Sequence, residues 1–161
     1  MRRSLVIGLA IGTVAVAMAG IVAEAFAQAR PLDMIRYRQS AMKGNGGYLN
    51  ALNAYAKGEV TVVTKDTIKA YAAALVGTSL EIPGMFPAGT DTGRTNAKPE
   101  IWQKNADFLA AAKRLGEEST KLAEVATAGN EAAMKEQIGK VAQACGGCHQ
   151  PFRKPLPPAA K

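Results

Sequence analysis

The stretch "ACGGCHQPFR", residues 144–153, contains the chain's only two cysteines, Cys145 and Cys148, and its only histidine, His149. Thiolates and imidazole are the side chains that bind transition metals most readily, so their grouping within five residues indicates a chemical site. Three kinds of site use such a pattern: a metal site, a thiol redox pair and a covalent attachment point for haem.

A zinc site and a redox pair both fit poorly. Structural zinc needs four protein ligands, and this chain offers one cysteine pair and one histidine with no second cluster. A reactive cysteine is favoured at a helix N-terminus, whereas the apolar spacing places Cys145 and Cys148 in the last turns of a helix. A disulfide between residues this close would close too short a loop to stabilise the fold.

Haem attachment fits both the spacing and the position of the motif. In Cys-x-x-Cys-His, the two thiols form thioethers with the haem vinyl groups, and the histidine becomes an axial ligand of the iron. Cys145 and Cys148 lie on one face of a helical turn, and His149 follows at once. The motif therefore predicts one covalently bound haem c per chain, with His149 as a metal ligand.

The motif does not specify which residue, if any, occupies the second axial position of the iron. Because His149 is the only histidine, a second strong side-chain ligand has to be a methionine, a lysine or a tyrosine. Methionine is the usual partner in electron transfer. Met134 lies on the same helix as His149 and too far along it, so Met34, Met42 and Met85 are the candidates.

Helices are the elements that must position these residues, since the sequence from residue 31 onward shows helical periodicity and no strand pattern. The first helix covers 33–57 and ends at Gly58, and the second begins after Thr64 as N-cap. A long loop over 81–98 follows, with Pro99 in the first turn of the third helix. Gly129 and Asn130 form a tight turn into the fourth helix, which we expect to end at the proline-rich tail from Pro151. Three glycines within the first helix, at 44, 46 and 47, suggest close packing or a kink.

This pattern predicts an all-α fold, an antiparallel four-helix bundle with a c-type haem near the C-terminus. The long connection is expected to be functional or to pack over something. Runs of alanine at 72–74 and 110–112 would leave room for a large ligand in the core.

The N-terminal residues read as an export signal. Arg2 and Arg3 precede an apolar stretch over 5–22, and Ala25-Phe26-Ala27 offers a signal-peptidase site. We expect a signal peptide over 1–27, cleaved after Ala27 or alternatively Ala29, and a mature haem domain over 28–161. A retained membrane anchor is the alternative. The rest of the chain has no apolar run of spanning length, so no stable membrane insertion is expected after cleavage.

The net charge of +7 fits several kinds of partner. Lysines and arginines are spread along the chain without interleaved aromatic residues, which argues against nucleic-acid binding. The positive balance is instead compatible with an acidic protein partner.

The chain resembles the cytochrome c-prime family, the class II c-type cytochromes. The resemblance rests on "YRQSAM" in the first helix, "KPEIW" opening the third, and "CGGCHQPFR" at the end. It implies that Met42 lies over the distal face of the iron, where low-spin members use a methionine ligand and five-coordinate members a blocking apolar residue. It also implies that Arg38 matches the arginine found near the haem in the five-coordinate members, and that Arg153 occupies a basic position after the motif in both groups. The stretch "MKGNGGYLNALNAYAKGE" is closest to the low-spin subgroup, and dimers are common in the family.

The expected function is therefore electron transport by a periplasmic c-type cytochrome, with His149 and Met42 as axial ligands and acidic redox proteins as partners. No proton-transferring pair beside a substrate pocket is evident, so we expect a carrier and not an enzyme. The alternative is a five-coordinate, high-spin protein that binds nitric oxide or carbon monoxide at the distal face.

Overall fold

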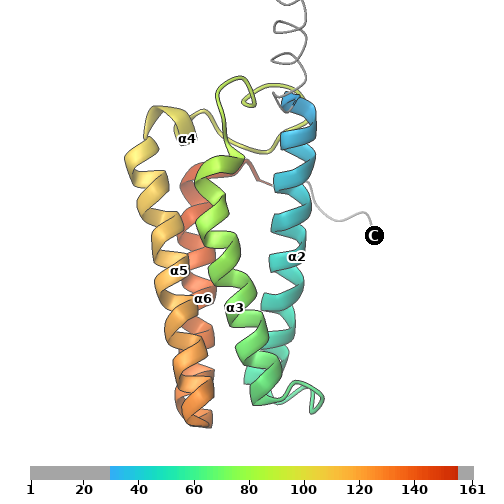
Figure 1. Ribbon diagram of the computed structural model, residues 1–161, viewed down its shortest axis with the longest axis vertical. Helices are drawn as coiled ribbons and strands as arrows, with labels where there is room; N and C mark the ends of the chain where they lie inside the picture. The colour runs from blue at the N-terminus through green and yellow to red at the C-terminus, as the bar shows by residue number, and fades with distance from the viewer. Residues whose placement is uncertain (1–29, 156–161) are drawn as a thin grey trace, which may run out of the picture.

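The computed structural model describes residues 30–155, so the expected signal peptide and both cleavage sites lie outside the described residues. Four long helices make up the fold: α2 (Pro31–Lys57), α3 (Lys65–Glu81), α5 (Asn105–Ala128) and α6 (Glu131–Phe152). They run alternately up and down in an antiparallel bundle (Figure 1). The predicted all-α four-helix bundle is confirmed. Over residues 30–155 the only β-type pairing is an isolated bridge between Ala97 and Arg153.

Most helix ends follow from the local sequence as predicted. Gly58 closes α2 in the left-handed region with φ of 75°, and Gly129 closes α5 in the same way with φ of 71°. The Thr64 hydroxyl accepts a hydrogen bond from the Thr67 N–H at 3.2 Å and so caps α3. Asn130 caps α6 by accepting from the Ala133 N–H at 3.0 Å. The turn between α5 and α6 is therefore as tight as expected.

Three boundaries differ from the predictions. The segment expected to be one loop from residue 81 begins with a 3₁₀ helix, η1 (Ile82–Met85), which continues directly from α3. The third helix is split into α4 (Glu100–Gln103) and α5, because the backbone at Lys104 leaves the helical region with φ of −118° and ψ of 49°. Helix α6 runs through Pro151 to Phe152, since a proline this close to a helix end removes only one of the last hydrogen bonds.

The expected distortion at the glycines of the first helix is absent. Helix α2 is continuous over Gly44, Gly46 and Gly47, and a Cβ atom added at any of them would meet nothing within 4 Å. The close helix approach occurs elsewhere, where a Cβ on Gly116 of α5 would lie 2.6 Å from the Ser79 Oγ of α3.

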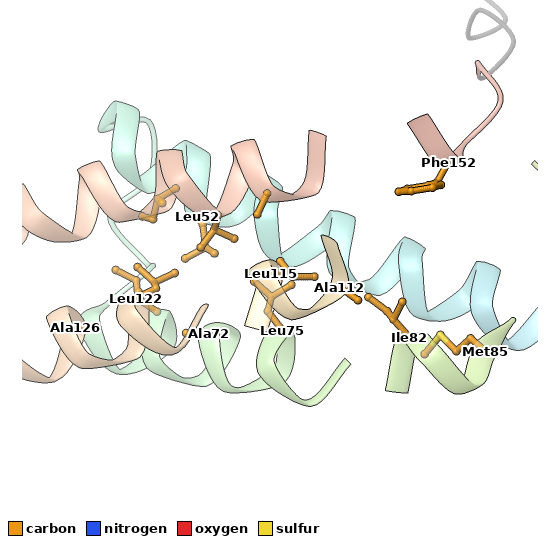
Figure 2. Close-up of a cluster of buried hydrophobic side chains, with 14 of the residues drawn as sticks. Leu52, Ala72, Leu75, Ile82, Met85, Ala112, Leu115, Leu122, Ala126 and Phe152 are labelled. Atoms are coloured by element: carbon orange, nitrogen blue, oxygen red, sulfur yellow. The ribbon is translucent and has the colours of Figure 1, made fainter. Parts of the chain in front are cut away.

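An apolar core runs along the bundle. Leu52, Ala72, Leu75 and Leu122 lie at its centre and are fully buried, and Ile82 and Met85 continue it towards the end where the long connection lies (Figure 2). Helix α5 packs extensively against both α3 and α6, whereas α2 makes fewer contacts with α3 and α6. No helix among residues 30–155 is long and apolar enough to cross a membrane.

Candidate haem site

A cavity of about 470 Å³ brings together the six residues that the sequence finally assigned to the site. Its lining includes Cys145, Cys148, His149 and Arg153 from the C-terminal end of α6 and its flank, and Arg38 and Met42 from α2. Cofactor pockets in proteins typically measure about 300 to 1,000 Å³, so this volume suits a large ligand.

Helix α2 forms one wall because its lining residues share a face. Arg38, Met42, Asn45 and Leu49 follow one another at helical spacing, and all four line the cavity. Gly46 also lines it, which explains why a Cβ there would meet no other atom.

The remaining walls are mostly apolar. They come from η1 and the connection after it, from α4 and α5, and from α6: Ile82, Phe86, Ile101, Phe108, Ala111, Ala112, Leu115, Ala144 and Phe152. Of the six alanines in the two noted runs, Ala111 and Ala112 are the ones that border this space. Phe108 packs edge-on against Phe86 and Phe152, with ring centroids 4.9 and 5.4 Å apart, so the three rings form one aromatic cluster on this side of the cavity.

The structure separates the candidate methionines. Met42 is the only methionine among residues 30–155 that lines the cavity. Met85 is 1% exposed and belongs to the hydrophobic core, as does Met134. Met34 lies in the first turn of α2, outside the lining. If a methionine binds iron in this cavity, that methionine is Met42.

The two thiols are partly buried and free. Burial raises the pKa of Cys145, and it raises the pKa of Cys148 to about 11, with the neighbouring Cys145 adding to the shift. Thiolate is the form that attacks disulfides and binds zinc, so both roles are disfavoured. Over residues 30–155, moreover, no three His, Cys, Asp or Glu side chains gather as a metal site would need.

His149 lies in the last turns of α6, one residue after Cys148. Burial lowers its pKa, and the charge of Arg153 lowers the pKa further. The imidazole is therefore held in its neutral form, which is the form that binds a metal.

Arg38 is 3% exposed and has an unusual set of partners. Its guanidinium donates to the Met85 carbonyl at 3.3 Å, to the Thr90 Oγ1 at 2.8 Å, to the Thr90 carbonyl at 2.6 Å and to the Thr95 Oγ1 at 2.7 Å. It also lies 4.6 Å from the centre of the Phe86 ring. Arg38 thus fastens the connection between η1 and α4 to α2, and burial lowers its pKa.

Arg153 lies at the edge of the cavity, where α6 ends. Its N–H donates to the His149 carbonyl at 3.0 Å, and Ala97 pairs with it in the isolated bridge. Next to it, Lys98 donates its N–H to the Phe152 carbonyl at 3.0 Å, and Lys154 donates its own to the Asn96 carbonyl at 2.7 Å. The connection is therefore tied to α6 as well as to α2.

Sequence reasoning missed the residues of this connection. Thr90 and Thr95 are buried at 1% and 8% exposure and satisfy Arg38, and the Trp102 Nε1–H donates to the Phe86 carbonyl at 3.0 Å. An arginine on the apolar stripe of the first helix was the available signal, since a buried guanidinium needs several acceptors.

The arrangement fits a haem c. Two thiols on one turn of α6 border an apolar cavity with a neutral imidazole beside them, and α2 supplies a thioether on a separate wall. The apolar walls suit the hydrophobic haem ring, the two thiols suit its two vinyl groups, and the imidazole suits its iron.

Comparison with known proteins identifies the family. Residues 33–153 match the family described as Cytochrome C'. This chain belongs to the cytochrome c' family. It is similar to cytochrome c' of Pararhodospirillum photometricum, at 35% identity over 127 residues that cover 78% of this chain and 100% of that protein. It is also similar to cytochrome c-556 of Agrobacterium tumefaciens, at 37% identity over 123 residues that cover 74% of this chain and 95% of that protein.

The fold agrees with that of solved family members. The nitric oxide complex of a cytochrome c prime variant from Alcaligenes xylosoxidans superposes with a TM-score of 0.72 at 29% identity, covering 80% of this chain and 99% of that chain. As a member of the cytochrome c' family, the chain binds haem c covalently, and Cys145 and Cys148 fit the attachment motif. Relatives named cytochrome c' and relatives named cytochrome c-556 match about equally, so the family is established and the predicted low-spin subgroup is not distinguished.

Proposed function

We propose that this cytochrome c' binds a small diatomic gas, nitric oxide or carbon monoxide, on the side of the haem that faces α2. The observation that carries the proposal is the composition of that wall. Met42 is a neutral thioether, and no histidine, cysteine or carboxylate accompanies it on the α2 side of the cavity, so no imidazole or anionic ligand competes with a gas there. A relative of the same fold forms a nitric oxide complex, which supports an accessible distal site.

In this proposal each residue of the cavity has a definite task. Cys145 and Cys148 hold the haem through thioethers, and His149 binds the iron with its neutral imidazole. Bound haem iron supplies reversible gas binding and one-electron exchange. Met42 would lie beside the bound gas, and the apolar side chains of the other walls would limit the access of water, so a neutral gas would enter more readily than a polar molecule.

The electron carrier with Met42 as sixth ligand, stated first from the sequence, is the second candidate. The comparisons favour the gas-binding alternative, because a gas-bound relative shares this fold. One observation still favours the carrier: Met42 is the sole methionine lining the described cavity. Either protein would be exported, since haem c is attached outside the cytoplasm and residues 1–27 resemble a signal peptide. We place it in the periplasm, as a monomer or homodimer.

Addition of carbon monoxide to the reduced holoprotein tests the proposal. We expect a high-spin reduced absorption spectrum that shifts on addition of the gas, with one molecule bound per haem. An unchanged, sharp low-spin spectrum with a methionine-to-iron band in the oxidised protein would favour the electron carrier instead.

A further inference from the structure

Basic side chains without acidic partners surround the mouth of the haem cavity. We call this set the basic rim: Lys43 on α2, Arg94 and Lys98 on the connection to α4, and Arg153 and Lys154 after α6. Four of the five are exposed and Lys98 is half-buried. Among residues 30–155, none of them forms a salt bridge.

The contacts of the backbone make the basic rim one continuous surface. The Gln39 amide, one turn before Lys43, donates to the Arg94 carbonyl at 2.9 Å. Beyond Arg94, the chain pairs with the end of α6, as the Lys98–Phe152, Lys154–Asn96 and Ala97–Arg153 contacts show. Gln39, Lys43, Asn96, Ala97 and Arg153 also line the cavity, so the rim encloses its opening.

Charge is distributed differently on the rest of the described molecule. All eight salt bridges lie elsewhere, on the first turns of α2, around the α2–α3 turn and along α5 and α6, and they include Lys57–Glu59, Lys113–Glu117 and Lys135–Glu131. Asp91 is the only acidic residue between Phe86 and Pro99. Five of the basic side chains that form no salt bridge, within the part of the chain that the structure describes, therefore lie around the opening of the haem cavity.

The surface chemistry selects an acidic protein over a membrane. Binding to a bilayer interface needs apolar side chains that enter it. The large apolar residues that are exposed, within residues 30–155, are Leu32, Tyr37, Val62, Leu80 and Leu109, and none of them lines the cavity. Exposed cations with hydrogen-bonding neighbours instead match the carboxylates of an acidic protein surface.

We propose that the basic rim is the docking surface for an acidic electron-donor protein. The donor's redox centre loses one electron and the ferric haem iron gains it, and no bond is made or broken. This inference rests on the proposed function in that both carbon monoxide binding and electron transport require ferrous iron. The rim brings the donor to the mouth of the cavity, where the path to the haem is shortest.

Reduction kinetics of the ferric holoprotein test the proposal. An acidic flavodoxin in its hydroquinone form serves as the protein donor, and neutral reduced lumiflavin serves as the uncharged donor. The variant R94Q/K98Q/K154Q removes three rim charges outside the cavity lining, and K57Q/K65Q/K135Q removes three exposed charges at the opposite end of the bundle. Both variants change the net charge equally.

We expect the flavodoxin rate to fall with rising salt, and to fall by about tenfold in the rim variant at low ionic strength. The control variant should retain a rate within about twofold of wild type, and lumiflavin should reduce all three proteins alike. The single variants R94Q and K154Q should each show part of the loss.

Equal flavodoxin rates in the rim and control variants would overturn the docking surface. So would rim-dependent binding to anionic phosphatidylglycerol vesicles together with a flavodoxin rate that salt does not change. Failure of lumiflavin to reduce the wild-type protein would instead contradict the proposed function, because it would show that the iron is not reducible.

Discussion

At the scale of single residues, Met42 could either cover the iron or bind it. The first role depends on the volume of the side chain and the second on its sulfur atom, so substitutions can distinguish them. As a cover, the side chain acts through its bulk and its apolar surface. As a ligand, it acts through the thioether lone pair, which leucine lacks. Because Leu and Met have similar volumes, Met42→Leu keeps the cover and removes the ligand, while Met42→Ala removes both.

We predict that Met42→Ala raises the association rate of carbon monoxide by about tenfold, equivalent to about 1.4 kcal/mol of steric barrier. Met42→Leu should change that rate by no more than about threefold and leave the reduced spectrum high-spin. Flash photolysis of the carbon monoxide complexes measures both rates. A wild-type spectrum that is low-spin, and becomes high-spin only in Met42→Leu, would show that the sulfur is an iron ligand.

The six residues that the sequence assigned to the site all line the cavity, whereas the buried threonines that satisfy Arg38 were missed. Spacing alone left Met34, Met42 and Met85 open, and only the resemblance to the family favoured Met42. Met85 lies on a segment whose path depends on the hydrogen bonds of Arg38 to residues 47 to 57 positions away, and no local pattern encodes those contacts. Residue roles that depend on tertiary contacts thus needed the structure.

At the scale of elements, one buried cation makes most of the side-chain contacts that hold the connection from η1 to α4 against α2. Arg38→Ala would remove the donor from the Thr90 and Thr95 hydroxyls and from the Met85 and Thr90 carbonyls. The two hydroxyls would keep only their bonds to the Pro87 carbonyl and the Ala97 N–H. We predict a loss of about 2 to 4 kcal/mol in the free energy of unfolding of the holoprotein. Urea unfolding followed by circular dichroism measures the loss, and hydrogen exchange should show faster exchange at residues 86–97.

Arg36→Ala is the matched control on the same helix. The Arg36 side chain is 69% exposed and lies 3.8 Å from Asp33, so its removal should cost less than about 0.5 kcal/mol. Similar losses for Arg36→Ala and Arg38→Ala would contradict the anchoring role of Arg38.

Helix boundaries were predictable where a capping residue or a glycine in the left-handed region ends or begins the helix. Gly58, Thr64, Gly129 and Asn130 act through their own backbone angle or side-chain oxygen, and all four were located correctly. The break at Lys104 was not predictable, because no glycine or proline marks it and Ile101, just before it, is buried against the core. Local chemistry specifies caps, whereas packing decided this break.

At the scale of the whole molecule, the bundle is built around a space that its own side chains do not fill. Without the haem, the apolar side chains that line the cavity would face water, which weakens the folded state by about 25 cal/mol for each Å² of apolar surface left exposed. The free energy of unfolding of a whole domain is about 5 to 15 kcal/mol.

We therefore predict that the haem-free chain loses cooperative unfolding. Cys145→Ser combined with Cys148→Ser prevents covalent attachment, and the purified haem-free protein should retain helical far-ultraviolet circular dichroism but lose its near-ultraviolet signal. Cys148→Ser alone keeps one possible thioether and serves as the control. A haem-free double variant that melts cooperatively at the temperature of the holoprotein would show that the bundle does not need its cofactor.

We propose that the iron has no protein ligand on the side that faces α2, and proton NMR of the reduced holoprotein tests this most directly. With His149 as the sole protein ligand and Met42 as a cover, ferrous iron is high-spin and paramagnetic. We predict haem and His149 resonances spread far outside the usual range, which collapse to a diamagnetic spectrum on addition of carbon monoxide. A diamagnetic spectrum before any gas is added, with a methionine methyl resonance shifted strongly upfield by the haem ring, would contradict this account.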